Sequence, residues 1–378
     1  MIMISTDALS SANRVCGTAP LREEEKRIRS AAVGFIRLQV ASVGLRVALA
    51  VAWLAVAAGA SIHGQPATSI DVVIDEWTVP VGSRPHDPAV APDGSIWYTG
   101  QRANTLGRLN PTTASVTEYA LPTANSGPHG LVADAAGNIW YTGNTARLVG
   151  RLDPATGEVR EFPMPDARAR DPHTPIFDAA GRLWFTVQGG NLVGRLAPAT
   201  GEITLVGSRT PNSLPYGIVI DSQGRPFFDL FGTNKIATID PDTLEIVEYA
   251  LPAGARPRRI AVAPDDVIWY TDYARGFLGR LDPRTGDVTE FASPGGRTSQ
   301  PYGMTSTSDG AIWYSESGVE PNTVVRFNPR DGSTQRWPIP SGGGVVRHMV
   351  TAPNDDVWLA CSGVDRLARV RVVSRGGG

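Results

Sequence analysis

Four of the five histidines in this chain occupy the same place in a sequence repeat, about eleven residues before an aromatic residue. They are His86, His129, His173 and His348. In the three other copies of the repeat, that place is held by Tyr216, Arg258 and Tyr302. Imidazole changes charge near neutral pH, and it can act as a general base or bind a metal or a ligand. We therefore expect a site in which histidines face Tyr, Arg and Tyr. The alternative is that these polar residues only fill a solvated channel.

Carboxylates near these positions could add oxygen ligands to such a site. Asp171 precedes His173 by two residues, so both side chains could face the same side of an extended strand. A carboxylate oxygen can bind a hard divalent cation while an imidazole takes up a proton. The other nearby carboxylates are Asp87, Asp272 and Glu316. No spacing among them forms a strong metal motif, and the sequence contains no Ser-His-Asp triad, phosphate-binding glycine loop or cysteine-rich zinc signature.

The repeat that carries these residues has seven copies, marked by aromatic residues about 43 positions apart. The markers are Trp97, Trp140, Trp184, Phe227, Trp269, Trp313 and Trp358. A unit of this length cannot bury a core alone and has to stack on its neighbours. In the second copy, four strands separated by turn residues are expected at 127–133, 138–142, 148–152 and 158–163. Seven such units predict an all-β fold, a seven-bladed β-propeller.

The propeller geometry places the polar residues and predicts how the ring closes. The first strand of each blade is innermost, so the seven side chains at one repeat position should meet at one mouth of the central channel. The seventh copy ends after its third strand, at residues 366–371, while residues 73–80 read like the missing outer strand. We therefore expect the N-terminal strand to complete the last blade, because this leaves no free sheet edge at the seam.

The N-terminal region has the features of an export signal. Residues 46–60 form an apolar run that is short for a membrane span and ends in Ala58-Gly59-Ala60, a small-residue pattern typical of a cleavage site. We expect a periplasmic or secreted protein without stable membrane insertion after cleavage; an uncleaved N-terminal anchor is the alternative. The predicted parts are a leader and signal peptide at 1–65, the propeller at 72–373 and a flexible tail at 374–378.

Composition limits the class of partner. The chain has 378 residues, 42% of them hydrophobic, and a formal net charge of −2 without a basic block or an acidic tail. Nucleic acid is therefore a poor candidate partner. The cysteines Cys16 and Cys361 provide no disulfide framework once a signal is removed. We expect a monomer whose partner is a small-molecule substrate or ligand.

The repeat resembles the virginiamycin B lyase (streptogramin B lyase) family over roughly residues 72–373. The resemblance is carried by Pro-His-Gly-Leu, Gly-Asn-Ile-Trp-Tyr-Thr, Leu-Val-Gly-Arg-Leu-Asp and Val-Arg-Glu-Phe, all within residues 128–162. Members of that family are seven-bladed propellers that linearise cyclic depsipeptide antibiotics by elimination across the ester and require Mg²⁺. The resemblance implies a carbon–oxygen lyase in which the metal polarises the ester carbonyl and a histidine removes the proton from the neighbouring carbon.

The family pattern can be placed on this chain in two ways. The family has two histidines on successive inner strands of blades six and seven, the second within Glu-Pro-His, and a glutamate four residues after the following aromatic. In the same linear position this chain has Tyr302 and His348, with Val346 and Ser362 in place of the two glutamates.

Rotated around the ring, the pattern fits blades two and three better. At the corresponding positions of these two blades, the chain has His129, then Asp171-Pro172-His173, then Gln188. The resemblance thus implies His129 and His173 as catalytic residues and Asp171 and Gln188 as ligands of Mg²⁺. The other residues of the repeat position are expected to bind substrate: His86, Tyr216, Arg258, Tyr302 and His348.

Two classes of function remain open. The first is an exported lyase that eliminates across an ester of a cyclic depsipeptide such as streptogramin B. The second is a non-catalytic propeller that binds a small ligand or a partner protein at the channel mouth. Metal-dependent lactone hydrolysis is a weaker third candidate, because the sequence offers no carboxylate-rich calcium cage.

Overall fold

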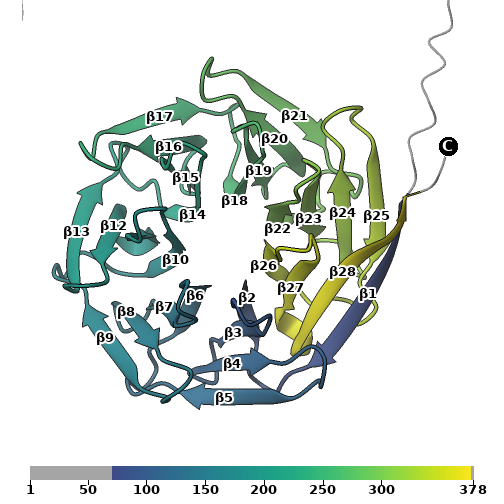
Figure 1. Cartoon of the computed structure of the whole chain (residues 1–378). Helices are drawn as coiled ribbons and strands as arrows, with labels where there is room; N and C mark the ends of the chain where they lie inside the picture. The colour runs from purple at the N-terminus through teal and green to yellow at the C-terminus, as the bar shows by residue number, and fades with distance from the viewer. Residues whose placement is uncertain (1–69, 376–378) are drawn as a thin grey trace, which may run out of the picture. The chain divides into compact units, whose positions relative to one another are not determined.

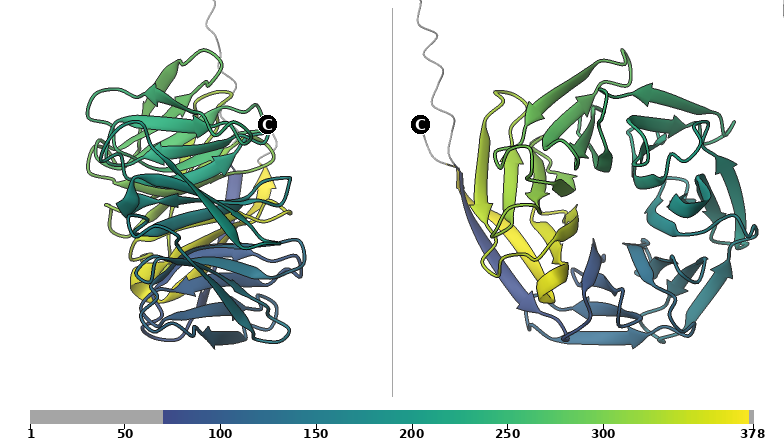
Figure 2. Two further views of the ribbon diagram at one scale, coloured as in Figure 1. Left: turned by 90° about the vertical axis from the view of Figure 1, so that its left-hand side faces the viewer. Right: turned by 180° about the vertical axis from the view of Figure 1, so that it is seen from behind.

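Seven antiparallel sheets of four strands each form a ring around a central channel. The structure, a computed structural model, describes residues 70–375. Figure 1 shows the innermost strands around the channel and the outermost strands on the perimeter, and Figure 2 shows the same ring from the side and from behind. The prediction of an all-β, seven-bladed propeller is confirmed. The expected export segment at 46–60 lies outside the described residues and stays a prediction, and among the described residues no helix is long and apolar enough to cross a membrane.

Each blade contributes one strand to each of four concentric layers. The innermost strands are β2 (Pro85–Val90), β6 (Pro128–Ala133), β10 (Pro172–Phe177), β14 (Pro215–Ile220), β18 (Pro257–Val262), β22 (Pro301–Ser306) and β26 (Val346–Thr351). The second strands are β3 (Ile96–Gly100), β7 (Ile139–Gly143), β11 (Leu183–Val187), β15 (Pro226–Leu230), β19 (Ile268–Asp272), β23 (Ile312–Glu316) and β27 (Val357–Cys361).

The two outer layers are more polar. The third strands are β4 (Thr105–Leu109), β8 (Leu148–Leu152), β12 (Leu192–Ala197), β16 (Lys235–Ile239), β20 (Phe277–Leu281), β24 (Thr323–Phe327) and β28 (Arg366–Arg375). The fourth strands are β5 (Val116–Ala120), β9 (Val159–Pro163), β13 (Glu202–Gly207), β17 (Ile246–Ala250), β21 (Val288–Ala292), β25 (Thr334–Pro338) and β1 (Ile70–Thr78). Since β1 pairs with β28, the first described strand and the last share one blade. Two short 3₁₀ turns, η1 (Gln188–Gly190) and η2 (Ser362–Val364), follow β11 and β27.

Alternation along the second strand explains why the blades stack. Trp97 packs in the cluster shared with blade two, whereas its neighbour Tyr98 packs in the cluster shared with blade seven. Successive side chains of a strand point to opposite faces, so one strand serves two interfaces. Gly107 lies across from Tyr98, and a Cβ there would come within 2.0 Å of the phenol ring. The glycine of the recurring Gly-Arg pair therefore makes room for a buried tyrosine and has a structural role.

In five of the seven blades, a hydrogen bond from a hydroxyl group on the second strand links the blade to the next. The Thr99 hydroxyl donates to the His129 carbonyl at 2.7 Å, and Thr142 donates to His173 at 2.5 Å. Thr186, Thr271 and Ser315 do the same in blades three, five and six. These bonds fix the inner strands against one another at the height of the predicted site.

Blade four uses a carboxyl group at the position of these hydroxyls. Asp229 occupies the position in blade four that Thr186 occupies in blade three. Its side chain is fully buried, and its Oδ1 has no hydrogen-bond partner. Burial raises the pKa of Asp229 well above its usual value, while the Gly217 amide and Arg259 oppose the shift. A protonated Asp229 can donate to the Arg258 carbonyl as the threonines donate in other blades, so we expect this carboxyl group to be neutral in the folded protein.

Replacing Asp229 with threonine should stabilise the fold, and more so at high pH. The pKa of Asp229 is higher in the folded protein than its ordinary value of 3.8 in the unfolded chain, so protonation of this group favours folding. This contribution to stability is complete below pH 3.8 and is lost as pH rises through the folded pKa. Asp229→Thr should therefore gain little at pH 4 and on the order of 1–3 kcal/mol at pH 8, measured by urea unfolding. The control Thr186→Val should lose about 1 kcal/mol equally at both pH values. A gain that does not depend on pH would contradict a neutral Asp229.

Candidate functional site

Six side chains form most of a ring inside the channel, each one residue after the proline that begins an inner strand. They are His86, His129, His173, Tyr216, Arg258 and Tyr302. The ring centroids of His86 and His129 are 3.8 Å apart, those of His129 and His173 are 3.7 Å apart, and those of His173 and Tyr216 are 3.8 Å apart. The structure thus brings together the predicted residues of blades one to six. We call these six residues and Arg347 the channel ring.

The prediction that His348 belongs to this ring is wrong. Val346 pairs with Cys361 just as Pro301 pairs with Glu316 in the preceding blade, so the residue equivalent to Tyr302 is Arg347. His348 lies one residue further along β26 and lines a cavity on another side of the ring. The spacing to the aromatic could have shown this, because Arg347, and not His348, stands eleven positions before Trp358. Valine in place of the usual proline hid the register.

One residue further along the inner strands, Arg259 crosses the channel. Its Nη2 donates to Asp87 Oδ1 at 2.8 Å, its Nη1 donates to Thr174 Oγ1 at 2.9 Å, and its Nε donates to the Arg347 carbonyl at 3.1 Å. The guanidinium also lies 5.2 Å from the Tyr216 ring, and the residue is only 1% exposed. This arginine therefore contacts blades one, three, four and seven from blade five. Sequence reasoning missed it, although four of the other six blades have glycine or threonine at its position.

Burial and this cation set the protonation states of the ring. Burial lowers the pKa of His86 to about 4, although Asp87 Oδ1 lies 2.8 Å from His86 Nδ1 and opposes the shift. Burial and neighbouring imidazoles hold the pKa of His129 well below its usual value, and burial and Arg259 do the same for His173. Burial alone would raise the pKa of Asp87, but Arg259 and its histidine neighbours hold it well below the usual range. The imidazoles are neutral at pH 7 and Asp87 is ionised.

Tyrosines and an arginine form the opposite arc of the ring. The hydroxyl groups of Tyr216 and Tyr302 are hydrogen bonded to each other. The Arg258 guanidinium lies 4.0 Å from the Tyr302 ring centroid and 4.2 Å from that of Tyr273, a geometry that favours a cation over aromatic faces. Arg258 Nε is buried without a partner. Arg258 and Arg347 are both partly exposed, so this arc can offer positive charge to a ligand.

The residues expected to hold Mg²⁺ lie next to each other at the entrance to strand β10. The backbone amide of Gln188 donates to the backbone carbonyl of Asp171 at 2.9 Å, and Asp171 adopts a left-handed backbone with φ of 61°. Asp171 Oδ1 is buried without a hydrogen-bond partner, and burial raises the pKa of this carboxyl group. The unpartnered carboxylate oxygen of Asp171 suits Mg²⁺, which keeps most of its ligands as water, and Gln188 begins the adjoining turn η1.

Other carboxylates near the ring are already engaged. Asp272 forms an ion pair with Arg275 Nε at 2.5 Å. Glu316 accepts from Ser293 Oγ at 2.6 Å and from Thr323 Oγ1 at 2.7 Å. These two carboxylates stabilise loops at the strand ends. They are therefore poor metal ligands, contrary to the suggestion from the sequence.

A second cluster of potential metal ligands lies inside the channel. His86, Asp87 and His129 offer three ligand atoms within 4.8 Å of one another. Asp87 Oδ1, however, is the oxygen that binds Arg259, and the pair is buried at 1% exposure on each side. A cation at this place would have to displace a guanidinium from its counter-charge in a poorly solvated site. The cluster does not fit a resident metal in the arrangement observed.

Sequence and structure comparisons relate the chain to one family. The virginiamycin B lyase family matches residues 52–231 and 208–375. A virginiamycin B lyase of Nocardia farcinica (strain IFM 10152) is 30% identical over 156 residues, which are 41% of this chain and 51% of the relative. The match thus spans about half the length of that curated relative.

Solved structures of this kind share the fold. A streptogramin B lyase structure has a TM-score of 0.73 at 24% identity, covering 80% of this chain and 98% of that chain. The virginiamycin B lyase from Staphylococcus aureus has a TM-score of 0.72 at 23% identity, covering 80% of this chain and all of that chain, 100%. A catalytically inactive variant of the S. aureus enzyme with quinupristin has a TM-score of 0.73 at 23% identity, with the same coverage of 80% and 100%.

Removing the Arg259 guanidinium should strongly destabilise the propeller. Arg259→Met leaves Asp87 buried without the guanidinium that balances its charge, which should cost about 3–5 kcal/mol of unfolding free energy in urea titrations. The double variant Asp87→Asn with Arg259→Met should recover a large part of this loss, because no buried charge remains uncompensated. The exposed pair of Arg284 and Asp282 provides a control, since Arg284 is 68% exposed and Arg284→Met should change stability by less than about 1 kcal/mol. Equal losses in the single and the double variant would contradict this role.

The neutral imidazoles should also make the fold sensitive to acid. Histidine in an unfolded chain protonates near its ordinary pKa of 6.5, whereas His86 resists protonation down to about 4. Its contribution to stability is therefore present above pH 6.5 and is lost as pH falls toward 4, by at most ~1.4 kcal/mol per pH unit for each such histidine. Urea unfolding at pH 7, 6 and 5 should show this slope, and His86→Gln should make it shallower. An unchanged slope in the variant would mean that His86 is protonated in the folded state.

Proposed function

Because the chain belongs to the virginiamycin B lyase family, we propose that it is a carbon–oxygen lyase that eliminates across an ester of a cyclic depsipeptide or a similar carbonyl compound. The proposed site is the face of the channel ring beside Asp171 and Gln188. The observation that supports it best is the stack of His86, His129 and His173, held neutral by burial and facing an arc of tyrosines and arginine. Unprotonated imidazoles next to hydrogen-bond donors and a cation are what proton abstraction beside a carbonyl requires.

The proposed reaction balances without water. His129 or His173 takes a proton from the carbon next to the one that carries the ester oxygen. The electrons of that carbon–hydrogen bond form a carbon–carbon double bond, and the carbon–oxygen bond breaks. The ester oxygen leaves with its electron pair as a carboxylate, whose charge Arg258 can stabilise. The imidazolium then returns its proton to solvent.

Asp171 and Gln188 would hold Mg²⁺ in this proposal. When bound, the ion would polarise the ester carbonyl, which makes the departing carboxylate a better leaving group. The channel ring itself orients the substrate: Tyr302 and Arg258 on one arc face His129 on the other. Residues 46–60, proposed as an export signal, would place this activity in the periplasm or the medium.

A second function, ligand binding without catalysis, is favoured by how deeply the histidines are buried. His129 is 4% exposed and His173 is 2% exposed, so a bulky cyclic ester touches them only if the rim of the channel opens. Burial also weakens an imidazole as a base while keeping it unprotonated. The same arc of tyrosines and arginine would then hold a small ligand at the rim.

Mass spectrometry of streptogramin B after incubation with the full chain and Mg²⁺ tests these functions. Elimination gives a linear product of unchanged mass, which is told from the intact antibiotic by its chromatographic retention and its fragmentation, whereas hydrolysis adds one water. We expect the product of unchanged mass, a loss of turnover of at least about 100-fold in His129→Ala or His173→Ala, and a higher Mg²⁺ requirement in Asp171→Asn. His348→Phe is the matched histidine control and should retain turnover, since His348 is outside the ring. Intact antibiotic with folded wild-type protein would favour the binding function, and a gain of water would favour lactone hydrolysis.

A further inference from the structure

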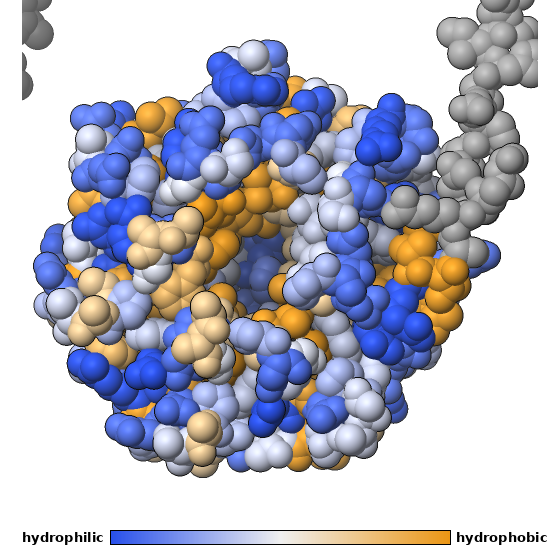
Figure 3. All heavy atoms as spheres, viewed as in Figure 1, coloured by the Kyte–Doolittle hydropathy of each residue, from blue (hydrophilic) through white to orange (hydrophobic). Residues whose placement is uncertain are grey.

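The channel opens on the other side of Arg259 into a cavity that the channel ring does not reach. Its volume is about 560 Å³ and it is lined by the second halves of the inner strands. Figure 3 shows this face hollowed at its centre, with hydrophobic residues around the hollow and hydrophilic residues at its floor. The apolar wall is formed by Val90, Leu131, Val132, Ile176, Ile218 and Val219. A cavity of a few hundred cubic ångströms with an apolar wall is typical of small-molecule sites.

Most polar side chains on the wall already have partners. Thr305 Oγ1 lies 2.9 Å from Thr351 Oγ1, which in turn donates to the Ser306 carbonyl at 2.7 Å. Thr174 Oγ1 accepts from Arg259 Nη1 at 2.9 Å and lies 2.9 Å from His173 Nδ1. These hydroxyl groups are therefore engaged with the protein and have little to offer a ligand.

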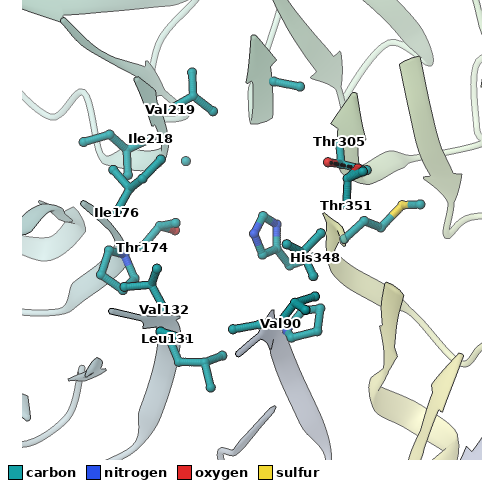
Figure 4. Close-up of a pocket in the computed structure, with 18 of the residues that line it drawn as sticks. Val90, Leu131, Val132, Thr174, Ile176, Ile218, Val219, Thr305, His348 and Thr351 are labelled. Carbon is teal, nitrogen blue, oxygen red and sulfur yellow. Dashed lines mark hydrogen bonds between the residues drawn. The ribbon is translucent and has the colours of Figure 1, made fainter. Parts of the chain in front are cut away.

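His348 is different, because its imidazole points into the cavity and forms no hydrogen bond with the threonines of the wall. Figure 4 shows this ring between the aliphatic wall and the two threonines. Nδ1 of His348 is buried and has no hydrogen-bond partner. Burial, together with Arg259, lowers the pKa of His348 to about 3, so the imidazole is neutral. His348 is only partly buried, so a ligand in the cavity can hydrogen bond to the exposed edge of the neutral imidazole, although it cannot reach the buried Nδ1.

The floor of the cavity also carries no uncompensated charge. Arg259 is the cation of the floor, and its guanidinium is already paired with Asp87 at 2.8 Å. A carboxylate ligand would have to compete with Asp87 for this cation and lose its own hydration inside an apolar wall. An uncharged ligand meets neither cost.

We propose that this cavity is a binding site for an uncharged, mostly apolar small molecule with one hydroxyl or carbonyl group that hydrogen bonds to His348. The apolar part of the ligand packs against Val132, Ile176 and Val219, where each buried CH₂ group contributes roughly 0.8 kcal/mol. This site is separated from the channel ring by Arg259, so the proposal does not rest on the elimination reaction.

Two bicyclic probes of matched shape test the proposal with the full chain. Isothermal titration should show that 2-naphthol binds the wild-type protein about tenfold more tightly than 2-methylnaphthalene, which lacks the hydroxyl group. In His348→Phe this preference should vanish while 2-methylnaphthalene still binds. Binding of both probes should be lost in Val132→Trp and in Val219→Trp, which fill the cavity from two strands. Val247→Trp on the exposed outer strand is the matched control and should bind both probes as the wild type does.

Each contrary result has a defined meaning. Equal affinities of the two probes for the wild-type protein, or a preference that persists in His348→Phe, would overturn the role of His348. Unchanged binding in both tryptophan variants, or no binding by the wild-type protein, would overturn the cavity as the site. Streptogramin B turnover measured on the same variants reports on the channel ring alone, so failure of one proposal is distinguishable from failure of the other.

Discussion

The buried ion pair of Arg259 and Asp87 is the contact on which the interior of this propeller depends. A ring of seven blades is held mainly by contacts between neighbours, and Arg259 adds contacts across the channel to blades on the far side. Its position also divides the channel into two parts. On one side lies the channel ring with its titratable groups, and on the other lies an apolar cavity. A guanidinium suits this place because its planar fork donates in several directions at once and stays charged when buried.

The properties of the channel ring follow from this division. Because Arg259 closes one side, the imidazoles are excluded from water and stay neutral although Asp87 is close to His86. Positive charge is supplied by Arg258 and Arg347, which are partly exposed on the other arc. A ring of this composition suits a substrate that develops negative charge on oxygen, and it suits a resident cation less well. Among residues 70–375, Asp171 has an unpartnered carboxylate oxygen on this face, and it belongs to blade three, whereas Arg258 and Arg347 belong to blades five and seven.

Near-symmetry of the blades explains how one fold can vary its chemistry. Equivalent positions in different blades carry side chains of similar geometry, as the hydroxyl groups of Thr99, Thr142 and Thr186 show. Asp229 enters the same position, and burial raises its pKa so that a carboxyl group can replace a hydroxyl. Exchange of side chains at equivalent positions leaves the backbone in place. The chain can thus share the fold of its family while the polar residues of the channel differ from blade to blade.

The sequence by itself determined the seven blades, their strands and six members of the channel ring. The spacing of the aromatic markers and the alternation of apolar residues along each strand can be read within every copy of the repeat. The sequence-based prediction was wrong for His348, where a missing proline hid a shift of one residue, and it left Asp272 and Glu316 open as possible ligands although their carboxylates are engaged by neighbouring side chains. Only the tertiary structure showed that Arg259 reaches Asp87 and Thr174 across the channel, since no repeat contains both ends of such a contact. The burial that keeps His129 and His173 neutral was likewise decided by ring closure, because solvent is excluded from the channel only when all seven blades are assembled.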